Sequence, residues 1–327
     1  MDYLSCKHVD RQGGSRLAGR FAVDLQLALV AALVLLMGGC SIQKLAVNAL
    51  GDSLASSGDV FTSDEDPELV RDAMPFTMKT IEMLLAESPD NRQLLLSACS
   101  LFTGYANLFV QVEAERLEEI DYQESERQYR RALGLYLRGR DYCFRSLELQ
   151  WPGIIDRLAT DPTAAVEVFE IEDVSLIFLT GASWGGAIAI GMDRPDLVAD
   201  FPAVRALMDR ALVLDESYDQ GAIHGVLITL NSLPESMGGS PDRARFHFER
   251  AVELSDGLSV GPYVSLAESV VVAEQNWEEF RDLLETALSI DPDEAPAIRL
   301  LNTIGQQRAQ WLLERIDLFF IDYPIEE

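Results

Sequence analysis

The stretch LIFLTGASWGGAIAIGMDRPDLV, residues 176–198, decides the fold, because it can be interpreted in three ways. It contains Gly181-Ala182-Ser183-Trp184-Gly185, which matches the G-x-S-x-G nucleophile elbow of α/β-hydrolases. It is also long and uncharged enough to raise the question of a membrane-spanning helix. The third interpretation is a buried helix inside an all-helical domain.

The surrounding sequence argues against a catalytic Ser183. An elbow serine follows a buried parallel strand in a sheet built from βαβ units, whereas residues 67–150 show helical periodicity and no HGGG-like loop. The histidine of a triad could be only His224 or His247, and both fall within helical patterns, where a histidine is more often structural. A serine hydrolase is therefore the least favoured function, and we expect a protein that is not an enzyme.

A membrane span is also disfavoured for this stretch. The uncharged segment between Asp173 and Asp193 includes four glycines and several hydroxyl side chains, so its apolarity is modest. Small residues between 181 and 189 would let neighbouring helices approach closely, with Trp184 as the one large group between them. We therefore predict a buried helix within stacked helix pairs.

The first 39 residues have the build of a secretory signal peptide. Arg11, Arg16 and Arg20 precede an apolar block that ends in Leu36-Met37-Gly38-Gly39-Cys40. This ending resembles a bacterial lipobox, in which Cys40 is acylated and becomes the first residue of the mature chain. The apolar block is short against the ~20 residues of a membrane helix, which is the alternative.

The expected domain organisation follows from this leader. We predict a signal peptide at 1–39, a lipidated N-terminus and linker at 40–66, and a helical domain at 67–327. Two or more acyl chains anchor a protein stably, so we expect attachment to the membrane through lipid alone. Ser41, rather than Asp, follows the cysteine and favours the outer membrane, with the protein facing the periplasm.

The charge and the metal-ligand residues exclude several classes of partner. The formal net charge is −28, and removal of a leader carrying +1 leaves −29. Such a surface repels nucleic acid. The negative charge is then explained either by solubility alone or by a basic protein partner. The 3 histidines have no metal-ligand spacing, and we expect neither metal nor cofactor.

Two further cysteines, Cys99 and Cys143, lie in the mature chain. They could pair in an oxidising periplasm, but both fall on apolar helical faces, where unpaired cysteine is common as a small hydrophobic residue. We favour buried and unpaired thiols, with pairing as the alternative.

Helical signals continue through the mature chain. The Ser-, Gly- and Asp-rich stretch from Ser56 is expected to be a loop, after which Asp66 caps a helix that starts at Pro67 and runs to Glu87. Near the C-terminus an apolar stripe predicts a long closing helix, with members Leu301, Ile304, Leu312, Ile316 and Phe319.

Three segments in the C-terminal half share one pattern of apolar residues. Ala211, Ala251 and Ala287 occupy equivalent positions in VRALMDRALVLDE, ARFHFERAVELSD and FRDLLETALSIDP. The pattern is similar to the second helix of a tetratricopeptide unit, A-x3-F-x2-A-x4-P, with irregular spacing. The predicted fold is all-α, with stacked helix pairs in a degenerate tetratricopeptide-like (TPR) solenoid.

The order of these blocks resembles a known family, the TRAP-transporter T-component family (TatT), helical lipoproteins associated with tripartite ATP-independent periplasmic transporters. The likeness extends from the lipobox to the last helix and is carried by LIFLTGASWGGAIAI, PDLVADFPAVRALMDRALVLDESYDQGAIH, RARFHFERAVELSDGLSVGPYVSLAESVVVAEQNWEEFRDLLETALSIDPD and QQRAQWLLERIDLFF. The resemblance implies a homotrimer with a central cavity. It also implies docking of a periplasmic solute-binding protein that exchanges a small hydrophobic or carboxylate-bearing ligand. A generic envelope scaffold is the alternative.

Four residues are candidates for a ligand or partner groove: Trp184, Tyr263, Glu268 and Arg308. Arg308 could hold a ligand carboxylate, although an arginine that snorkels or pairs inside the chain is the favoured interpretation. Trp184 is better explained as a core residue. Tyr263 is expected to be half-buried with its hydroxyl in contact with water, and Glu268 to be a solvent-exposed charged residue on a helix.

Overall fold

A computed structural model describes residues 58–324, which all fall within one structural unit. The described residues form helices and no strand, so the predicted all-α class is confirmed. Cys40, Ser41 and the predicted signal peptide lie outside the described residues. The tetratricopeptide-like character of the repeats stays a prediction, although Ala211, Ala251 and Ala287 are all fully buried where helices meet.

The N-terminal part forms a set of long helices. Asp66 accepts hydrogen bonds from the backbone N–H groups of Glu68 and Leu69, so the predicted cap and start at Pro67 are confirmed. The prediction of a loop from Ser56 was wrong in part, because residues Gly58–Thr62 form a short helix that packs on the late helix Arg299–Leu313. The elements are α2 (Gly58–Thr62), α3 (Pro67–Glu87), α4 (Arg92–Tyr105), the π-helix η1 (Ala106–Gln111), α5 (Val112–Leu117) and α6 (Tyr122–Gln150).

Shorter helices follow. The central part contains α7 (Ile154–Thr160), α8 (Pro162–Ala165), η2 (Val166–Val168), η3 (Ile171–Asp173), α9 (Val174–Ile190), α10 (Pro195–Val198) and α11 (Phe201–Leu214). The C-terminal part contains η4 (Tyr218–Gly221), α12 (Ala222–Asn231), η5 (Glu235–Met237), α13 (Pro241–Leu254), α14 (Gly261–Leu266), the π-helix η6 (Ala267–Val271), α15 (Trp277–Ser289), η7 (Pro292–Glu294), η8 (Pro296–Ile298), α16 (Arg299–Leu313) and α17 (Ile316–Phe319).

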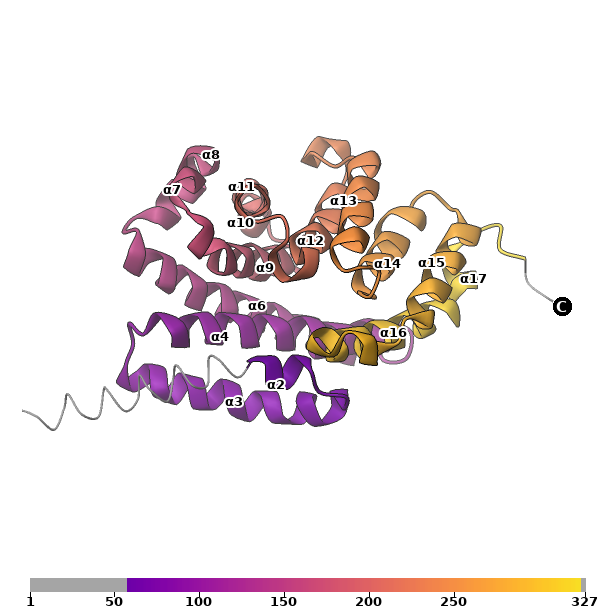
Figure 1. Cartoon of the computed structure of the whole chain (residues 1–327), viewed down its shortest axis with the longest axis horizontal. Coiled ribbons are helices and arrows are strands. Elements are labelled where there is room, and N and C mark those ends of the chain that lie inside the picture. The colour runs from indigo at the N-terminus through magenta and orange to yellow at the C-terminus, as the bar shows by residue number, and fades with distance from the viewer. Residues whose placement is uncertain (1–57, 325–327) are drawn as a thin grey trace, which may run out of the picture. The chain divides into compact units, whose positions relative to one another are not determined.

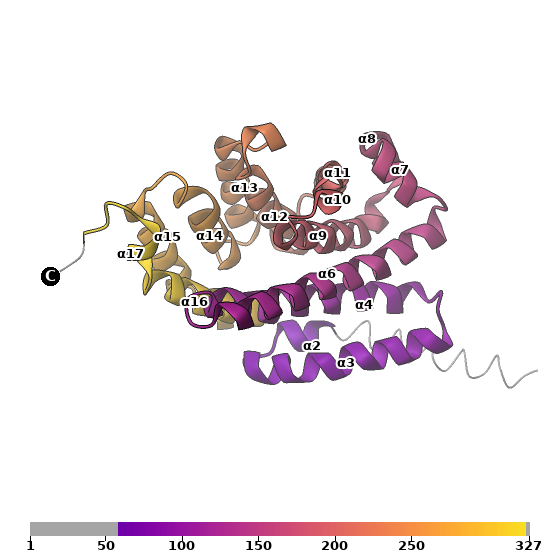
Figure 2. The same ribbon diagram turned by 180° about the vertical axis from the view of Figure 1, so that it is seen from behind.

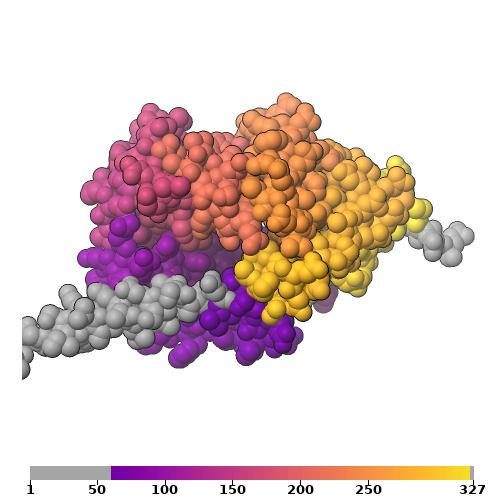
Figure 3. Space-filling view, viewed as in Figure 1, coloured from indigo at the N-terminus to yellow at the C-terminus, as the bar shows by residue number. Residues whose placement is uncertain are grey.

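Successive helices pack side by side, and the last long helix returns to the first. Helices α3, α4, α6, α9 and α11 each pack against the next, and α12 to α15 continue the series (Figures 1 and 2). Helix α16 packs on α14 and α15, and also on α2 and α3 near the other end of the described chain, as the yellow and indigo surfaces show in Figure 3. Leu300 and Ile304 of α16 thereby join the core beneath α3 and α4.

The closing stripe differs from the prediction at two points. Leu300 is buried, whereas the predicted Leu301 is 38% exposed. The helix also ends at Leu313, and a separate short helix α17 carries Ile316 and Phe319. In the first turn of α16 the core-facing residue is therefore Leu300, one position before the predicted Leu301.

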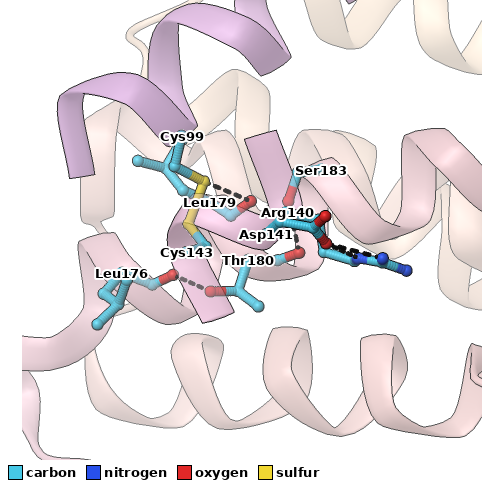
Figure 4. The surroundings of a disulfide bond; sticks show 8 residues. All are labelled: Cys99, Arg140, Asp141, Cys143, Leu176, Leu179, Thr180 and Ser183. Carbon is cyan, nitrogen blue, oxygen red and sulfur yellow. Dashed lines mark hydrogen bonds and ion pairs between the residues drawn. A yellow bond between two sulfur atoms is a disulfide. The ribbon is translucent and has the colours of Figure 1, made fainter. Parts of the chain in front are cut away.

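Helix α9 carries the stretch that decides the fold, and it is a buried helix. Ser183 is fully buried, and its hydroxyl donates to the carbonyl of Thr180 within the same helix at 3.0 Å (Figure 4). No strand precedes it among residues 58–182, so the elbow geometry is absent from this part of the chain. Trp184 is 2% exposed and packs edge-on against Phe144, with ring centroids 4.8 Å apart.

Two described stretches are long and apolar enough to cross a membrane, judged by length and composition alone. They are Arg92–Leu117 and Ile171–Ile190, and 44% and 56% of their most apolar windows are buried inside the fold. The core helix of a water-soluble domain passes the same test. Helix α9 fits that description, because it packs between α6 and α11.

The glycines of α9 differ in how much they matter for packing. A Cβ atom on Gly186 would lie 2.5 to 2.8 Å from three ring carbons of Tyr136, which is buried on α6. The ring cannot retreat easily, because its hydroxyl donates to Gln111. A Cβ on Gly185 would meet only Val204 at 3.4 Å, an ordinary contact. Close approach of α6 and α9 therefore depends on Gly186.

We predict opposite effects of alanine at these two positions. Gly186→Ala should lower the free energy of unfolding by about 1–2 kcal/mol. The clash of the new Cβ with Tyr136 destabilises the fold by more than the higher helix propensity of alanine stabilises it. Gly185→Ala should be neutral or stabilising by up to ~1 kcal/mol. Urea unfolding of the two variants measures the difference, and equal stabilities would show that α6 and α9 are not packed in this way.

The two cysteines form a disulfide between α4 and α6, so the expectation of unpaired thiols was wrong. The Cα atoms of Cys99 and Cys143 are 5.5 Å apart, and both residues are fully buried (Figure 4). The predicted burial is correct, but α4 and α6 pack directly against each other, which brings the two apolar faces together. The bond lies beside α9, near Leu179 and Thr180.

Candidate functional site

An arginine of the C-terminal helix holds two carboxylates from distant parts of the chain. Arg308 on α16 places Nη2 2.5 Å from Oε1 of Glu268 and Nη1 2.7 Å from Oε2 of Glu115. Its Nε also donates to Oε1 of Glu268 at 2.9 Å. The side chains of Arg308, Glu115 and Glu268 are 17%, 22% and 31% exposed, so this acidic–basic cluster is largely withdrawn from water. The pairing of Arg308 inside the chain, the favoured alternative, is confirmed.

One carboxylate stands in a π-helix and the other in the α-helix that follows a π-helix. Glu268 lies in the π-helix η6, and Glu115 lies in α5 directly after the π-helix η1. A π-helical turn inserts an extra residue into a helix and is frequent at functional sites. Arg308 therefore links α16 to the π-helix η6 and to α5, the helix directly after η1.

A hydrogen-bonded chain extends this cluster into the core. Oε1 of Glu115 accepts from the side-chain amide of Gln111 at 3.0 Å, and Oε1 of that amide accepts from the hydroxyl of Tyr136 at 2.9 Å. On the other side, the Arg308 guanidinium lies 4.6 Å from the centre of the Trp311 ring. Nη1 of Arg308 makes the ion pair with Glu115 without a hydrogen bond, whereas Nε and Nη2 both donate to Glu268. These linked contacts favour one fixed arrangement.

The charges of the cluster influence one another. Burial raises the pKa of Glu268, and the neighbouring Arg308 works against that rise. Desolvation opposes the charge on Arg308, but Glu268 and Glu115 outweigh it and raise the arginine pKa. Burial and a hydrogen bond donated to Glu118 raise the pKa of Tyr129 beside them. The arginine is therefore fully charged, and its Nε, Nη1 and Nη2 groups all face carboxylates of its own chain.

The four candidate groove residues do not gather in one groove. Only Glu268 and Arg308 contact each other, and the expectation of a solvated Glu268 was wrong because Arg308 draws it inward. Tyr263 on α14 is half-buried against Phe248, with ring centroids 5.3 Å apart, and burial raises the pKa of its hydroxyl. Trp184 lies in the core on α9, as its size suggested.

We predict that Arg308 contributes to stability through its carboxylates. Arg308→Met should lower the free energy of unfolding by about 2 kcal/mol, because it leaves two partly buried carboxylates without a partner. Arg315→Met is a matched control, since Arg315 also lies over Trp311 but its carboxylate neighbours are mostly exposed. Its effect should stay below ~1 kcal/mol. Equal effects in urea unfolding would assign the contribution to Trp311 rather than to the ion pairs.

A pocket of about 400 Å³, the η1 pocket, lies beside η1, and the sequence did not predict it. Its residues come from α3, α4, η1, α5, α6 and α16, and include charged side chains of both signs beside apolar ones: Glu68, Arg71, Glu113, Arg116, Arg131, Tyr105, Phe109 and Ile304. Arg116 and Arg131 fall in the charged stretch EAERLEEIDYQESERQYRR, where their type and spacing are those of a solvated helix face. A second, shallow hollow on α15 is bordered by Glu278, Glu279 and Asp282.

The two histidines of the described chain face each other. Nδ1 of His224 on α12 lies 2.8 Å from Nδ1 of His247 on α13, and both side chains are buried. Nε2 of His224 lies 3.3 Å from Glu216, which also pairs with Arg250. Both histidines lie buried within helices, as the helical patterns around them predicted. Across residues 58–324 no group of three or more His, Cys, Asp or Glu side chains could hold a metal ion.

Comparisons with known proteins give one family and one relative. A family model described as TRAP transporter T-component matches residues 63–320. A protein of Treponema pallidum (strain Nichols), named there only as an uncharacterized protein, is 31% identical over 310 residues. That alignment covers 88% of this chain and 95% of the relative.

Proposed function

This chain belongs to the TRAP transporter T-component family, and from that premise we propose that it is a non-enzymatic component of a TRAP-type uptake system that docks a periplasmic solute-binding protein. The match over residues 63–320 is the observation that carries the proposal, because it spans nearly all of the described helices. Burial of Ser183 inside α9 supports a role without catalysis. Family membership places the protein at the cell envelope as a transport component.

We further propose that the protein is a lipoprotein, anchored through Cys40 on the periplasmic face of the outer membrane. The lipobox and Ser41 support this placement. The disulfide between Cys99 and Cys143 supports an oxidising compartment, since such bonds are rare in the cytosol. In this arrangement acyl chains hold the protein at the membrane, and α9 stays inside the water-soluble domain.

The proposed assembly is a homotrimer that presents helical surfaces to the solute-binding protein. Stacked helix pairs offer extended faces to a protein partner. The net charge of −28 favours a partner with a basic docking face, and complementary charge would speed association. Binding should then weaken as ionic strength rises, because salt screens exposed charges.

Affinity capture from the native organism tests the docking role. The full chain, tagged at its C-terminus and extracted in mild detergent, should enrich a TRAP-type solute-binding protein over a tagged, unrelated lipoprotein. Raising the salt concentration should release it. Size-exclusion chromatography with light scattering on the same preparation should give the mass of a trimer. Capture of other envelope proteins without any solute-binding protein would instead favour a generic scaffold.

A further inference from the structure

Helix α3 carries a second apolar line on the side that faces away from the core. Its buried residues, from Val70 to Leu85, pack toward α4. On the opposite side Leu69, Phe76 and Met83 are 59%, 76% and 61% exposed, and no other phenylalanine among residues 58–324 is as exposed as Phe76. Figures 1 and 2 show α3 as the lowest helix in both views, with this side turned away from α4. We call it the outer side of α3.

The spacing on the outer side of α3 is that of a helix which packs on another helix. Leu69, Phe76 and Met83 follow one another every seven residues, so they form one line about 21 Å long. Ala73 and Thr80 stand between them, and the five positions alternate by four and three residues, as in a seam between paired helices. The Thr80 hydroxyl donates to the Phe76 carbonyl at 2.9 Å, so burial of the seam leaves it satisfied.

The pattern on the outer side of α3 is nearly the same in both chain directions. Leu69 lies seven residues before Phe76 and Met83 seven residues after it, while Asp72 lies four before and Lys79 three after. In an antiparallel pair of α3 helices that meet at Phe76, Leu69 of each chain faces Met83 of the other. Asp72 of each chain likewise faces Lys79 of the other, so two pairs of opposite charge form.

This charge pattern favours a second copy of the chain over other partners. In a parallel pair in register, Asp72 would face Asp72 and Lys79 would face Lys79, and like charges repel. A bilayer would have to take up the Asp72 carboxylate beside the apolar line, which is costly. Within the chain, Arg71 pairs with Asp72 at 3.3 Å and Lys79 with Glu82 at 2.9 Å. The Asp72 and Lys79 side chains are mostly exposed, so these ion pairs are weak and leave both charges within reach of another chain.

We propose that two copies of this chain pair through the outer sides of their α3 helices, antiparallel and about a two-fold axis at Phe76. The inference goes beyond the proposed homotrimer. A trimer closes through two different faces of each chain, whereas a two-fold contact uses the same face twice. Pairing through α3 therefore joins two trimers and gives an assembly with an even number of chains. The proposed lipid anchor holds the chains at one surface and raises their effective concentration.

Disulfide trapping in membranes of cells that express the full chain tests the proposal. Phe76→Cys places a thiol on the two-fold axis, and mild oxidation should link two chains into a dimer on a non-reducing gel. Val213→Cys is the matched control, because Val213 on α11 is 75% exposed but lies on another helix. We expect Phe76→Cys to form dimers faster than the control by about tenfold or more, because thiols held together react as at high concentration.

The direction of pairing is tested with two differently tagged chains. Chains with Leu69→Cys and chains with Met83→Cys should link to each other when they are expressed together. Neither should link to itself above the level of the Val213→Cys control. Links within the Leu69→Cys chains and within the Met83→Cys chains would show a parallel pair and overturn the proposal.

The role of charge is tested in the Phe76→Cys chain. Asp72→Lys should lower the rate of dimer formation by about tenfold, because like charges then meet at both ends of the seam. Lys79→Asp, added to Asp72→Lys, should restore the rate, because opposite charges meet again in the exchanged order. A role of these residues inside their own chain does not predict this rescue, since Arg71 and Glu82 would both meet like charges.

Equal rates for Phe76→Cys and Val213→Cys would overturn the proposal, as would an Asp72→Lys change without effect. Labelling with a water-soluble maleimide separates a bilayer from a second chain. If the thiol of Phe76→Cys neither links nor reacts with the maleimide, the bilayer covers the outer side of α3 and the proposal is wrong. Circular dichroism of the purified variants verifies that each is folded.

Discussion

Loss of the Cys99–Cys143 disulfide should lower the free energy of unfolding by about 4 kcal/mol, the largest single effect that we expect in this protein. The bond joins residues 44 positions apart and so restricts the unfolded chain substantially. In the folded protein it ties α4 to α6 directly beneath α9. Its removal should therefore weaken the part of the core on which the central helix rests.

Urea unfolding of the oxidised protein and of the Cys99→Ala, Cys143→Ala double variant measures this effect. Alanine avoids burying a new hydroxyl group at either position. The single variant Cys143→Ala is the control, because it also lacks the bond while keeping the Cys99 side chain. It should match the double variant to within ~1 kcal/mol, the usual scale of a small packing change. A double variant as stable as the oxidised protein would mean that the thiols are not bonded in solution.

The facing histidines should make the fold sensitive to acid. Burial, together with the neighbouring His224, Arg243 and Arg205, lowers the pKa of His247 to about 4 from an ordinary value of 6.5. Nδ1 atoms 2.8 Å apart can share only one proton, which also disfavours charging of the pair. Between pH 6.5 and pH 4, His247 is therefore mostly protonated in the unfolded chain and mostly neutral in the folded protein. Stability is fully present above pH 6.5 and falls as the pH drops through this window.

We expect His247 alone to remove about 2 kcal/mol of stability between pH 7 and pH 5. The measurement compares unfolding free energies of the natural protein and His247→Gln across this range, since the amide of glutamine can donate to His224 without titrating. The natural protein should lose stability more steeply than the variant by that amount. Parallel curves would show that His247 is protonated equally in the folded and unfolded states.

Local signals in the sequence predicted local structure well. Asp66 and Pro67 mark the start of α3, and Ser88 to Asn91 mark its end, because caps and turns act through hydrogen bonds between near neighbours. The small residues of α9 likewise predicted a buried helix. Composition alone was not sufficient there, because the helical periodicity of the surrounding residues was needed to disfavour a catalytic serine after a strand.

Contacts between distant helices could not be predicted in the same way. Burial of Cys99 and Cys143 followed from the apolar faces of their helices, but their pairing required knowing that α4 lies against α6. Glu268 was expected in water because its partner Arg308 stands 40 residues away. The periodicity of a single sequence predicts helices, but it does not predict the angle at which two helices cross or which helix packs against which.

The η1 pocket was missed for a further reason. The π-helix inserts an extra residue after Tyr105, so side chains beyond it no longer follow the 3.6-residue repeat of α4. Arg116 and Arg131 stand in a run of charged residues that is typical of a solvated helix surface. That they line a pocket is visible only once the neighbouring helices are in place.

Residues 176–190 belong to α9, the buried helix at the centre of the described helices. Hydrogen exchange of the full chain in non-ionic detergent, resolved by peptide, tests this claim most directly. We expect amides from Ile177 to Ala187 to exchange only through global unfolding, and their protection to weaken in Gly186→Ala together with that of the α6 peptides. Rapid exchange of these amides, or protection that survives unfolding of α6 because detergent surrounds the helix, would contradict it.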